Sequence, residues 1–194
     1  MRRTGTLIVA LLFWAGNCAA QHSSQMSDVN FRYSAQVSNT DGVNRSSFTL
    51  RGGAAEAAWS ITDLRKHTTL ETVADFGVEH TGAVANADYG LTLTTIAFGP
   101  RLKTSVNGKT SIFAQMLYGV ALGTGSQFPQ SNSFTSSASS YALSLGGGAE
   151  IALNKRWSIR AAQLDYLRTG LPNISSNWQN SLRVAGGVTL RLHP

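Results

Sequence analysis

Alternation of apolar and polar side chains with a period of two runs along most of this chain, and it limits the possible fold more than any other feature. The clearest case lies near the C-terminus, where Leu182, Val184, Val188 and Leu190 alternate with residues that include Arg183. Such alternation is typical of a β-strand with one apolar face, whereas an amphipathic helix repeats its apolar residues every three to four positions. No helical repeat follows residue 20, so the sequence predicts an all-β protein.

Eight segments follow this pattern, four of them clearly and four in a weaker form. The clear segments are 69–79, 110–123, 141–153 and 182–192, and the weaker ones are 31–37, 48–59, 89–102 and 157–168. Two of the weaker segments change phase. One change falls near Thr94-Thr95, and the other near Ala161-Ala162, where a β-bulge would restore the outward direction of Leu164 and Tyr166.

The connections between these segments alternate between short and long. Short turns are expected at 60–67, 103–109 and 154–156, and longer polar loops at 38–47, 80–88, 123–140 and 169–178. The loop at 123–140 has no charged residue, and we expect it to be mobile. Short turns at one end and long loops at the other are the layout of an eight-stranded, antiparallel, up-and-down transmembrane β-barrel.

A soluble ligand-binding barrel would also contain eight strands, but its apolar side chains would face inward. Two observations favour the membrane. Only 13% of the residues are charged, against ~25% in ordinary soluble domains. Aromatic residues also gather at the ends of the strands, as in the two girdles of membrane barrels. Phe76, Tyr89, Tyr118, Tyr141, Tyr166 and Trp178 lie toward the long loops, and Trp59, Phe98 and Trp157 toward the short turns.

The N-terminal 20 residues have the three parts of a secretory signal peptide. Arg2 and Arg3 form the basic start, residues 7–15 are apolar, and Cys18-Ala19-Ala20 supplies small residues for cleavage. This apolar run is too short for a membrane-spanning helix, which needs ~20 residues. An anchor on a lipid-modified Cys18 is the weaker alternative.

The expected organisation is a signal peptide over 1–20, a short extension over 21–28 and a β-barrel over 29–192. Cys18 is the only cysteine, so the exported chain would have no disulfide and no cysteine-based site. The net charge of +6 is small, and we expect no nucleic-acid partner.

Two segments resemble strands of a known family. The sequence QNSLRVAGGVTLRL, residues 179–192, resembles the C-terminal strand of Gram-negative outer-membrane barrels. The sequence RWSIRAAQLDYLRTG, residues 156–170, resembles the penultimate strand of the small OmpA-like and OmpX-like barrels. The likeness covers residues 29–192. One departure is the final Leu192-His193-Pro194, because family members usually end in an aromatic residue.

The resemblance implies a monomer in the outer membrane, in contact with its lipid and inserted by the barrel assembly machinery through the C-terminal strand. It also implies a barrel alone, without the peptidoglycan-binding domain of the larger relatives, and no cofactor.

The polar face of the strands would place charges of both signs inside the barrel. An eight-stranded barrel leaves room for little more than side chains, so these charges would form a paired polar core or, alternatively, a gated pore or proton pathway. The expected residues are Glu71, Asp75, Glu79, Glu150, Arg160, Asp165, Arg183 and Arg191.

Basic residues concentrate in or beside the three short turns. They are Arg65, Lys66, Lys103, Lys109, Lys155 and Arg156. They would either keep the turns soluble or contact anionic headgroups of the periplasmic leaflet.

These features favour an integral outer-membrane protein with a structural or surface-interaction role and no catalysis. A small gated channel is the alternative. A lipid-modifying enzyme centred on Glu79-His80, in the expected loop at 80–88, is less favoured, because a solvated loop histidine is the commoner explanation. Gly146-Gly147-Gly148 precedes no helix, so close packing in a strand explains it better than a phosphate loop does. No motif identifies a surface ligand or a metal site.

Overall fold

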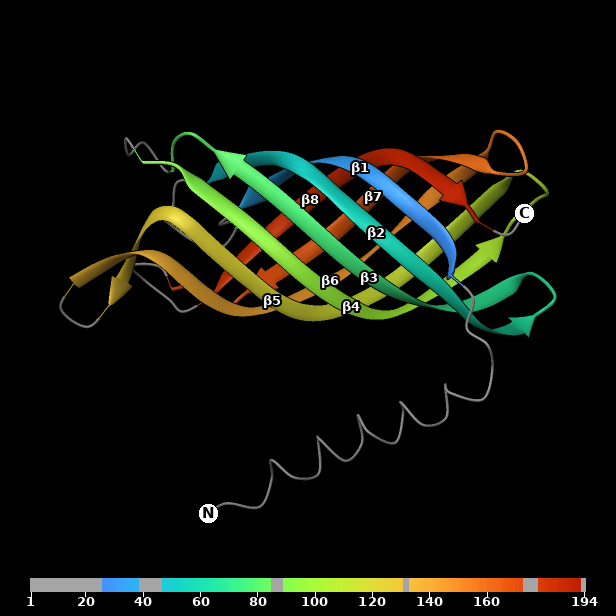
Figure 1. Ribbon diagram of the computed structural model, residues 1–194, viewed down its shortest axis with the longest axis horizontal. Coiled ribbons are helices and arrows are strands. Elements are labelled where there is room, and N and C mark those ends of the chain that lie inside the picture. Colours follow the sequence, from blue (N-terminus) through green and yellow to red (C-terminus); the bar gives the residue numbers. More distant parts are fainter. Residues whose placement is uncertain (1–25, 39–46, 85–88, 131–132, 173–177, 193–194) are drawn as a thin grey trace, which may run out of the picture.

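The computed structural model describes residues 26–38, 47–84, 89–130, 133–172 and 178–192, and these form one closed antiparallel barrel (Figure 1). The expected signal peptide, 1–20, lies outside the described residues. No helix among the described residues is long and apolar enough to cross a membrane. The strands are β1 (Met26–Ser38), β2 (Phe48–Arg65), β3 (Thr68–Thr81), β4 (Leu91–Ser105), β5 (Thr110–Gln130), β6 (Ser133–Ala152), β7 (Trp157–Thr169) and β8 (Gln179–Arg191).

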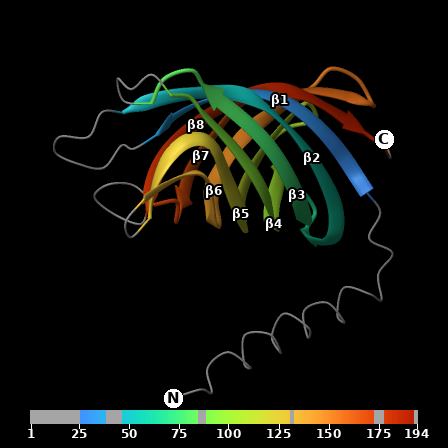
Figure 2. The ribbon, with the colours of Figure 1, turned by 60° about the vertical axis from the view of Figure 1, so that its left-hand side comes forward.

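Each strand pairs with its neighbours in sequence, and β1 closes the ring by pairing with β8. At the closure Phe31 lies opposite Val188, and Ala35 lies opposite Val184. The strands curve around a common axis in both ribbon views (Figure 2). The predicted all-β, eight-stranded, up-and-down fold is thus confirmed. A closed ring satisfies the backbone hydrogen bonds of every strand, which is what a sheet in lipid requires.

The hairpins at the two ends of the barrel differ in length from those expected. We call the end where β1 begins and β8 finishes the inner end, and the opposite one the outer end. At the inner end, β2 runs to Arg65 and β3 starts at Thr68, so most of the turn expected at 60–67 is strand. Two register shifts, at Ser60/Thr62 and Asp63/Arg65, let this pairing continue. β1 likewise begins at Met26, before the expected start of the barrel at Val29.

The expectation of a mobile loop over 123–140 is wrong for most of its length. β5 and β6 stay paired beyond the ring as a two-stranded ribbon, in which Phe128 lies opposite Thr135 (Figure 1). A register shift between Thr124 and Phe128 interrupts the pairing, and Gly125 adopts φ 87° there, a backbone conformation that favours glycine. Phe128 is buried and anchors the ribbon, which explains its order.

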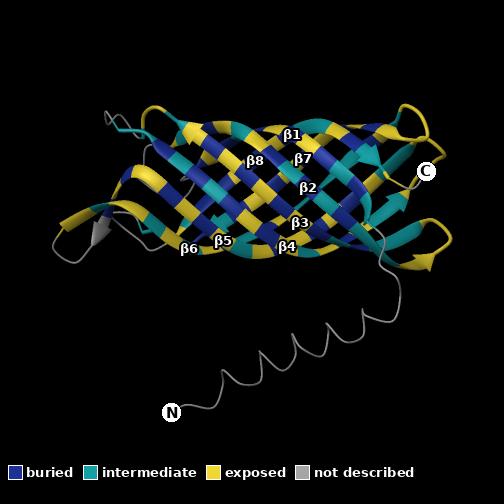
Figure 3. Ribbon diagram, in the orientation of Figure 1, coloured by how far each residue is buried: buried dark blue, intermediate teal, exposed yellow. Residues whose placement is uncertain are grey.

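Buried and exposed residues alternate along much of each strand within the ring (Figure 3). The outer face carries a belt of exposed apolar residues, whereas polar and charged residues fill the interior. In β7 the register shifts between Arg160 and Gln163, and Leu164 and Tyr166 are exposed. The predicted bulge near Ala161-Ala162 is therefore confirmed. The belt includes Phe31, Phe76, Ile96, Phe98, Ile112, Met116, Tyr118, Leu145, Ile159, Leu164, Val184 and Val188.

The expected change of phase near Thr94-Thr95 does not occur. Leu91, Leu93 and Arg101 all lie inside, and Ile96 and Phe98 lie outside. The interior itself changes along the axis, because an apolar cluster lies in its outer end and the buried charges lie deeper. This outer plug consists of Leu50, Leu91, Leu93, Ala121, Phe128, Ala142, Leu167 and Leu171.

The belt predicts the effect of a charge on the outer face. Val188 is 43% exposed on β8, whereas the next residue, Thr189, is fully buried inside. We expect Val188→Arg to lower the free energy of unfolding by about 2 to 4 kcal/mol in lipid vesicles, because arginine on a lipid-facing strand loses its hydration. Urea unfolding would measure it, with Val188→Ala as the control. Equal stability of the two variants would contradict a lipid-facing Val188.

Candidate functional site inside the barrel

The interior holds most of the acidic residues of the chain. Seven of the ten are buried, and the side chains of four arginines and a lysine face them. The acids are Asp28, Glu56, Glu71, Asp75, Glu79, Glu150 and Asp165, and the cations are Arg32, Arg101, Lys103, Arg160 and Arg183. Burying a charge without a partner is costly, so the ion pairs among these groups determine whether the barrel is stable.

Glu56 of β2 lies at the centre of the network. Its carboxylate contacts three guanidinium groups: Arg101 at 2.6 Å, Arg160 at 2.8 Å and Arg32 at 3.4 Å. Arg160 donates hydrogen bonds to both carboxylate oxygens, at 3.1 and 2.8 Å. These arginines come from β4, β7 and β1, so the pairs with Arg101 and Arg160 connect strands that are not neighbours in the ring.

Arg183 of β8 has the converse arrangement nearer the outer plug. One guanidinium group contacts three carboxylates: Asp165 at 3.2 Å, Glu79 at 3.6 Å and Asp75 at 3.8 Å. Arg32 joins the two groups, since it pairs with both Glu56 and Asp75. The ion pairs therefore form one continuous network across the interior.

Close packing around this network depends on Phe113 and on glycines. The guanidinium carbons of Arg101 and Arg160 lie 4.5 and 4.6 Å from the centre of the Phe113 ring, which is a cation–π arrangement. A Cβ atom at Gly148 would lie 2.8 Å from that ring, and one at Gly146 would lie 2.0 Å from the Asp165 carboxylate. The glycine triplet therefore makes room for the network, in agreement with the packing interpretation.

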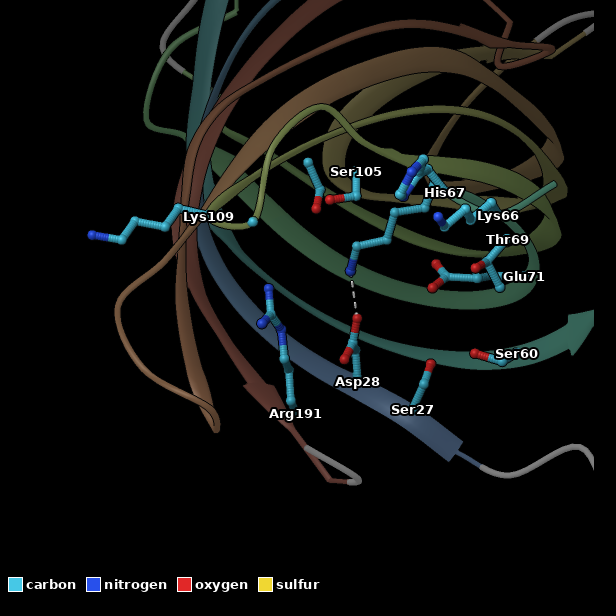
Figure 4. A pocket seen from close by; sticks show the side chains of 13 residues that line it. Ser27, Asp28, Ser60, Lys66, His67, Thr69, Glu71, Ser105, Lys109 and Arg191 are labelled. Atoms are coloured by element: carbon cyan, nitrogen blue, oxygen red, sulfur yellow. Dashed lines mark hydrogen bonds and ion pairs between the residues drawn. The ribbon is translucent and has the colours of Figure 1, made fainter. Parts of the chain in front are cut away.

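At the inner end the network borders a polar pocket of about 340 Å³ (Figure 4). Lys103 lies in its wall and pairs with Asp28 at 2.6 Å and with Glu150 at 2.9 Å. Glu71 lines the same pocket, 3.8 Å from Arg101. The described residues contain no cluster of histidine, cysteine and carboxylate side chains that could hold a metal ion.

The structure brings together all the interior residues expected from the sequence except one. Glu71, Asp75, Glu79, Glu150, Arg160, Asp165 and Arg183 are buried in the network. Arg191 is half-buried and lines the inner pocket. Sequence reasoning missed Asp28, Arg32, Glu56 and Arg101. Arg32 alternates with the apolar residues Phe31 and Tyr33, so its inward direction could have been predicted. The outward neighbours of Glu56 are small, so the sequence hardly distinguishes the two faces of the strand there.

Five of the six basic residues expected near the short turns are exposed: Arg65, Lys66, Lys109, Lys155 and Arg156. The expectation is wrong for Lys103. It belongs to β4, and its side chain, 13% exposed, lies inside the inner end because Asp28 and Glu150 offer it two carboxylates.

Glu79 and His80, the candidate catalytic pair, are not in a loop. Both belong to β3, and consecutive strand residues point to opposite faces. Glu79 accepts a hydrogen bond from Ser34 inside the barrel at 2.7 Å, whereas His80 is exposed outside and lies 3.0 Å from the Thr92 hydroxyl. The two side chains therefore do not form an acid–histidine pair.

Comparison with known proteins supports the fold. No family model and no curated protein sequence matches this chain. Neisserial surface protein A matches with a TM-score of 0.64 and 12% identity, over 88% of this chain and 100% of the other. Ail, the attachment invasion locus protein of Yersinia pestis, was solved with the heparin analogue sucrose octasulfate. It matches with a TM-score of 0.50 and 12% identity, over 85% of this chain and 99% of the other.

These matches confirm, as a likeness of fold, the predicted resemblance to small outer-membrane barrels. The chain thus has the fold of a transmembrane β-barrel of the outer-membrane type, with an apolar belt on its outer face, where such a barrel contacts lipid.

The network predicts that Arg183 is essential for stability. Arg183→Met would leave three buried carboxylates without their shared cation, and we expect the free energy of unfolding to fall by about 3 to 5 kcal/mol. Arg51→Met is the matched control, because Arg51 is exposed, and it should change stability by less than about 0.5 kcal/mol. Urea unfolding followed by tryptophan fluorescence measures both. A loss for Arg183→Met no larger than the control would contradict the role of the network.

Proposed function

We propose that this protein is an integral outer-membrane barrel with a structural or surface-interaction role, and that it neither catalyses a reaction nor conducts ions. One observation carries the proposal: ion pairs and an apolar cluster occupy the interior beyond the inner pocket. Beyond the inner pocket, Glu56 and its three arginines bridge the walls, and the apolar plug lies beyond Arg183. Meanwhile the apolar belt faces outward along the strands.

The ribbon of β5 and β6 is the part best suited to surface interaction. It extends past the ring at the outer end (Figure 1), where the long loops of an outer-membrane barrel face the exterior of the cell. Its described residues are uncharged and rich in serine, and Phe134 is 62% exposed. Hydroxyl groups and one exposed ring favour contact with a polar partner, whose identity the residues do not specify.

The barrel works as a monomer in this proposal and reaches the membrane through the barrel assembly machinery. Support comes from β8, whose outward residues Leu182, Val184 and Val188 continue the pattern of C-terminal strands in outer-membrane barrels. Ring closure between β1 and β8 leaves no unpaired strand edge within the ring that would call for a second copy.

A gated channel is the second candidate, and the pocket at the inner end is the observation that favours it. For conduction, however, Arg101, Arg160 and Glu56 would have to separate, and the outer plug would also have to open. Catalysis is less favoured, because Glu79 and His80 point to opposite faces of β3.

Planar-bilayer recording tests the proposal. The inserted protein should give no steady unitary current, because the ion pairs and the plug leave no continuous aqueous path. A general porin recorded in the same bilayers controls for their sensitivity, and heat-modifiable gel migration verifies that the protein is folded. Steady open-channel currents from folded protein would overturn the closed-barrel proposal and favour the channel.

A further inference from the structure

Two turns at the inner end share one sequence pattern and one set of hydrogen bonds. They are residues 106–110, VNGKT, and 153–157, LNKRW, each with an aliphatic residue, an asparagine and a cation in the fourth place. The side-chain oxygen of Asn107 accepts hydrogen bonds from the backbone N–H groups two and three positions later, at 2.9 and 2.7 Å. Asn154 does the same at 2.8 and 2.8 Å. Both turns are therefore fixed in the same conformation.

Each turn exposes an aliphatic side chain next to a basic one. Val106 and Leu153 are both 61% exposed, and Lys109 and Arg156, in the equivalent fourth positions, are also exposed. An exposed aliphatic residue at the tip of a tight turn stabilises nothing inside the barrel. Its repetition in both turns points to an external apolar contact.

Backbone hydrogen bonds hold the two turns and the end of β8 side by side. The Ala152 N–H group donates to the Lys109 carbonyl at 2.7 Å, and the Arg191 N–H group donates to the Arg156 carbonyl at 2.7 Å. A continuous surface results, which we call the paired-turn patch. It consists of Val106, Lys109, Leu153, Lys155 and Arg156.

The cations of the patch are not neutralised within the described part of the chain. None of the ion pairs there includes Lys109, Lys155 or Arg156. Asp28 and Glu150 are the acids closest to the patch along the paired strands, and both are already bound to Lys103. The patch therefore attracts anions from outside the protein.

The patch also lies beside the edge of the apolar belt. Trp157 follows Arg156 directly and is 44% exposed, as expected of an aromatic residue at the membrane interface. Ile112 and Ile151 are exposed on the outer face. Each is only two or three residues from a turn, which corresponds to roughly 7 to 10 Å along a strand. That distance places Lys109, Lys155 and Arg156 at the level of lipid headgroups.

We propose that the paired-turn patch binds the phosphate headgroup of anionic phospholipids in the inner leaflet. The cations contact phosphate, and Val106 and Leu153 enter the interfacial layer beside it. The inference rests on the proposed function, which puts the short turns at the periplasmic surface. It goes further by assigning one side of the rim to one class of lipid.

Arg65 and Lys66 supply a matched comparison at the same end of the barrel. They carry the same charge as Lys109 and Arg156 but lie on the extended β2–β3 hairpin, which projects away from the ring (Figure 1). On that hairpin an acidic neighbour, Asp63, accepts a hydrogen bond from Thr69 at 2.7 Å. Headgroup binding at the patch should therefore not depend on these two residues.

The test uses quenching of Trp157 fluorescence in a W59F/W178F background of the processed chain. The protein is folded into phosphatidylcholine vesicles that contain a minor fraction of brominated phosphatidylglycerol. Binding at the patch should quench Trp157 more than random mixing of the lipids predicts. Lys109→Ala with Arg156→Ala should lower this enrichment on the order of tenfold, whereas Arg65→Ala with Lys66→Ala should leave it unchanged.

Each outcome is decisive. Quenching at the level of random lipid mixing would overturn the patch as a site. An equal loss of enrichment in both double variants would also overturn it, and would indicate only diffuse attraction between the basic rim and anionic lipid. A third variant, Val106→Ser with Leu153→Ser, should reduce enrichment while keeping all the charges; unchanged enrichment would overturn the apolar part. Heat-modifiable migration, measured on every sample, separates these results from failure of the membrane proposal, in which the chain would not insert at all.

Discussion

The structure depends on the ion pairs that cross the interior of the barrel, above all those of Glu56. An eight-stranded ring has space inside for side chains and little else, so charged groups there have to neutralise one another. Glu56 meets arginines from three other strands, and Arg183 meets carboxylates from two. The pairs of Glu56 with Arg101 and Arg160 join strands that share no backbone hydrogen bonds, and so do the pairs of Arg183 with Asp75 and Glu79. These contacts fix the shape of the ring in a way that pairing of adjacent strands alone does not.

This interior determines what the outer face can do. With most of the acids and four arginines inside, the strands present apolar residues outward and remain compatible with lipid. The change from charged network to apolar plug along the axis closes the interior without a separate domain. The exposed cations at the inner rim are free to act outside the barrel, whereas Lys103 is held inside by two carboxylates and Arg191 lines the inner pocket.

Much of the fold was predictable, because alternation directly reflects which face of a strand is apolar. Where alternation is regular, as around Asp75 and Arg183, both the strand and the inward direction were predicted. Alternation did not reveal the inward direction of Glu56 in β2. The outward residues Gly53, Ala55 and Ala57 are small, so the two faces of this strand differ little in hydrophobicity. The prediction from alternation also failed in β4. Leu91 and Leu93 point inward as part of the apolar plug, so the apolar residues move from inward to outward positions although the strand keeps its phase.

The remaining differences come from contacts between distant segments, which no local pattern contains. The ribbon of β5 and β6 looked like a polar loop because its order depends on Phe128 packing into the plug. Glu56 was missed as the centre of the network because its arginines come from strands far away in the sequence.

The most direct test of the network is a double-mutant cycle between Glu56 and Arg160. The free energy of unfolding would be measured for the native chain, Glu56→Gln, Arg160→Met and the double variant, all in the same vesicles. If the pair connects non-neighbouring strands as described, the double variant should lose less stability than the sum of the two single losses, by about 1 to 3 kcal/mol. Strictly additive losses would mean that the two side chains act independently, and they would contradict the account.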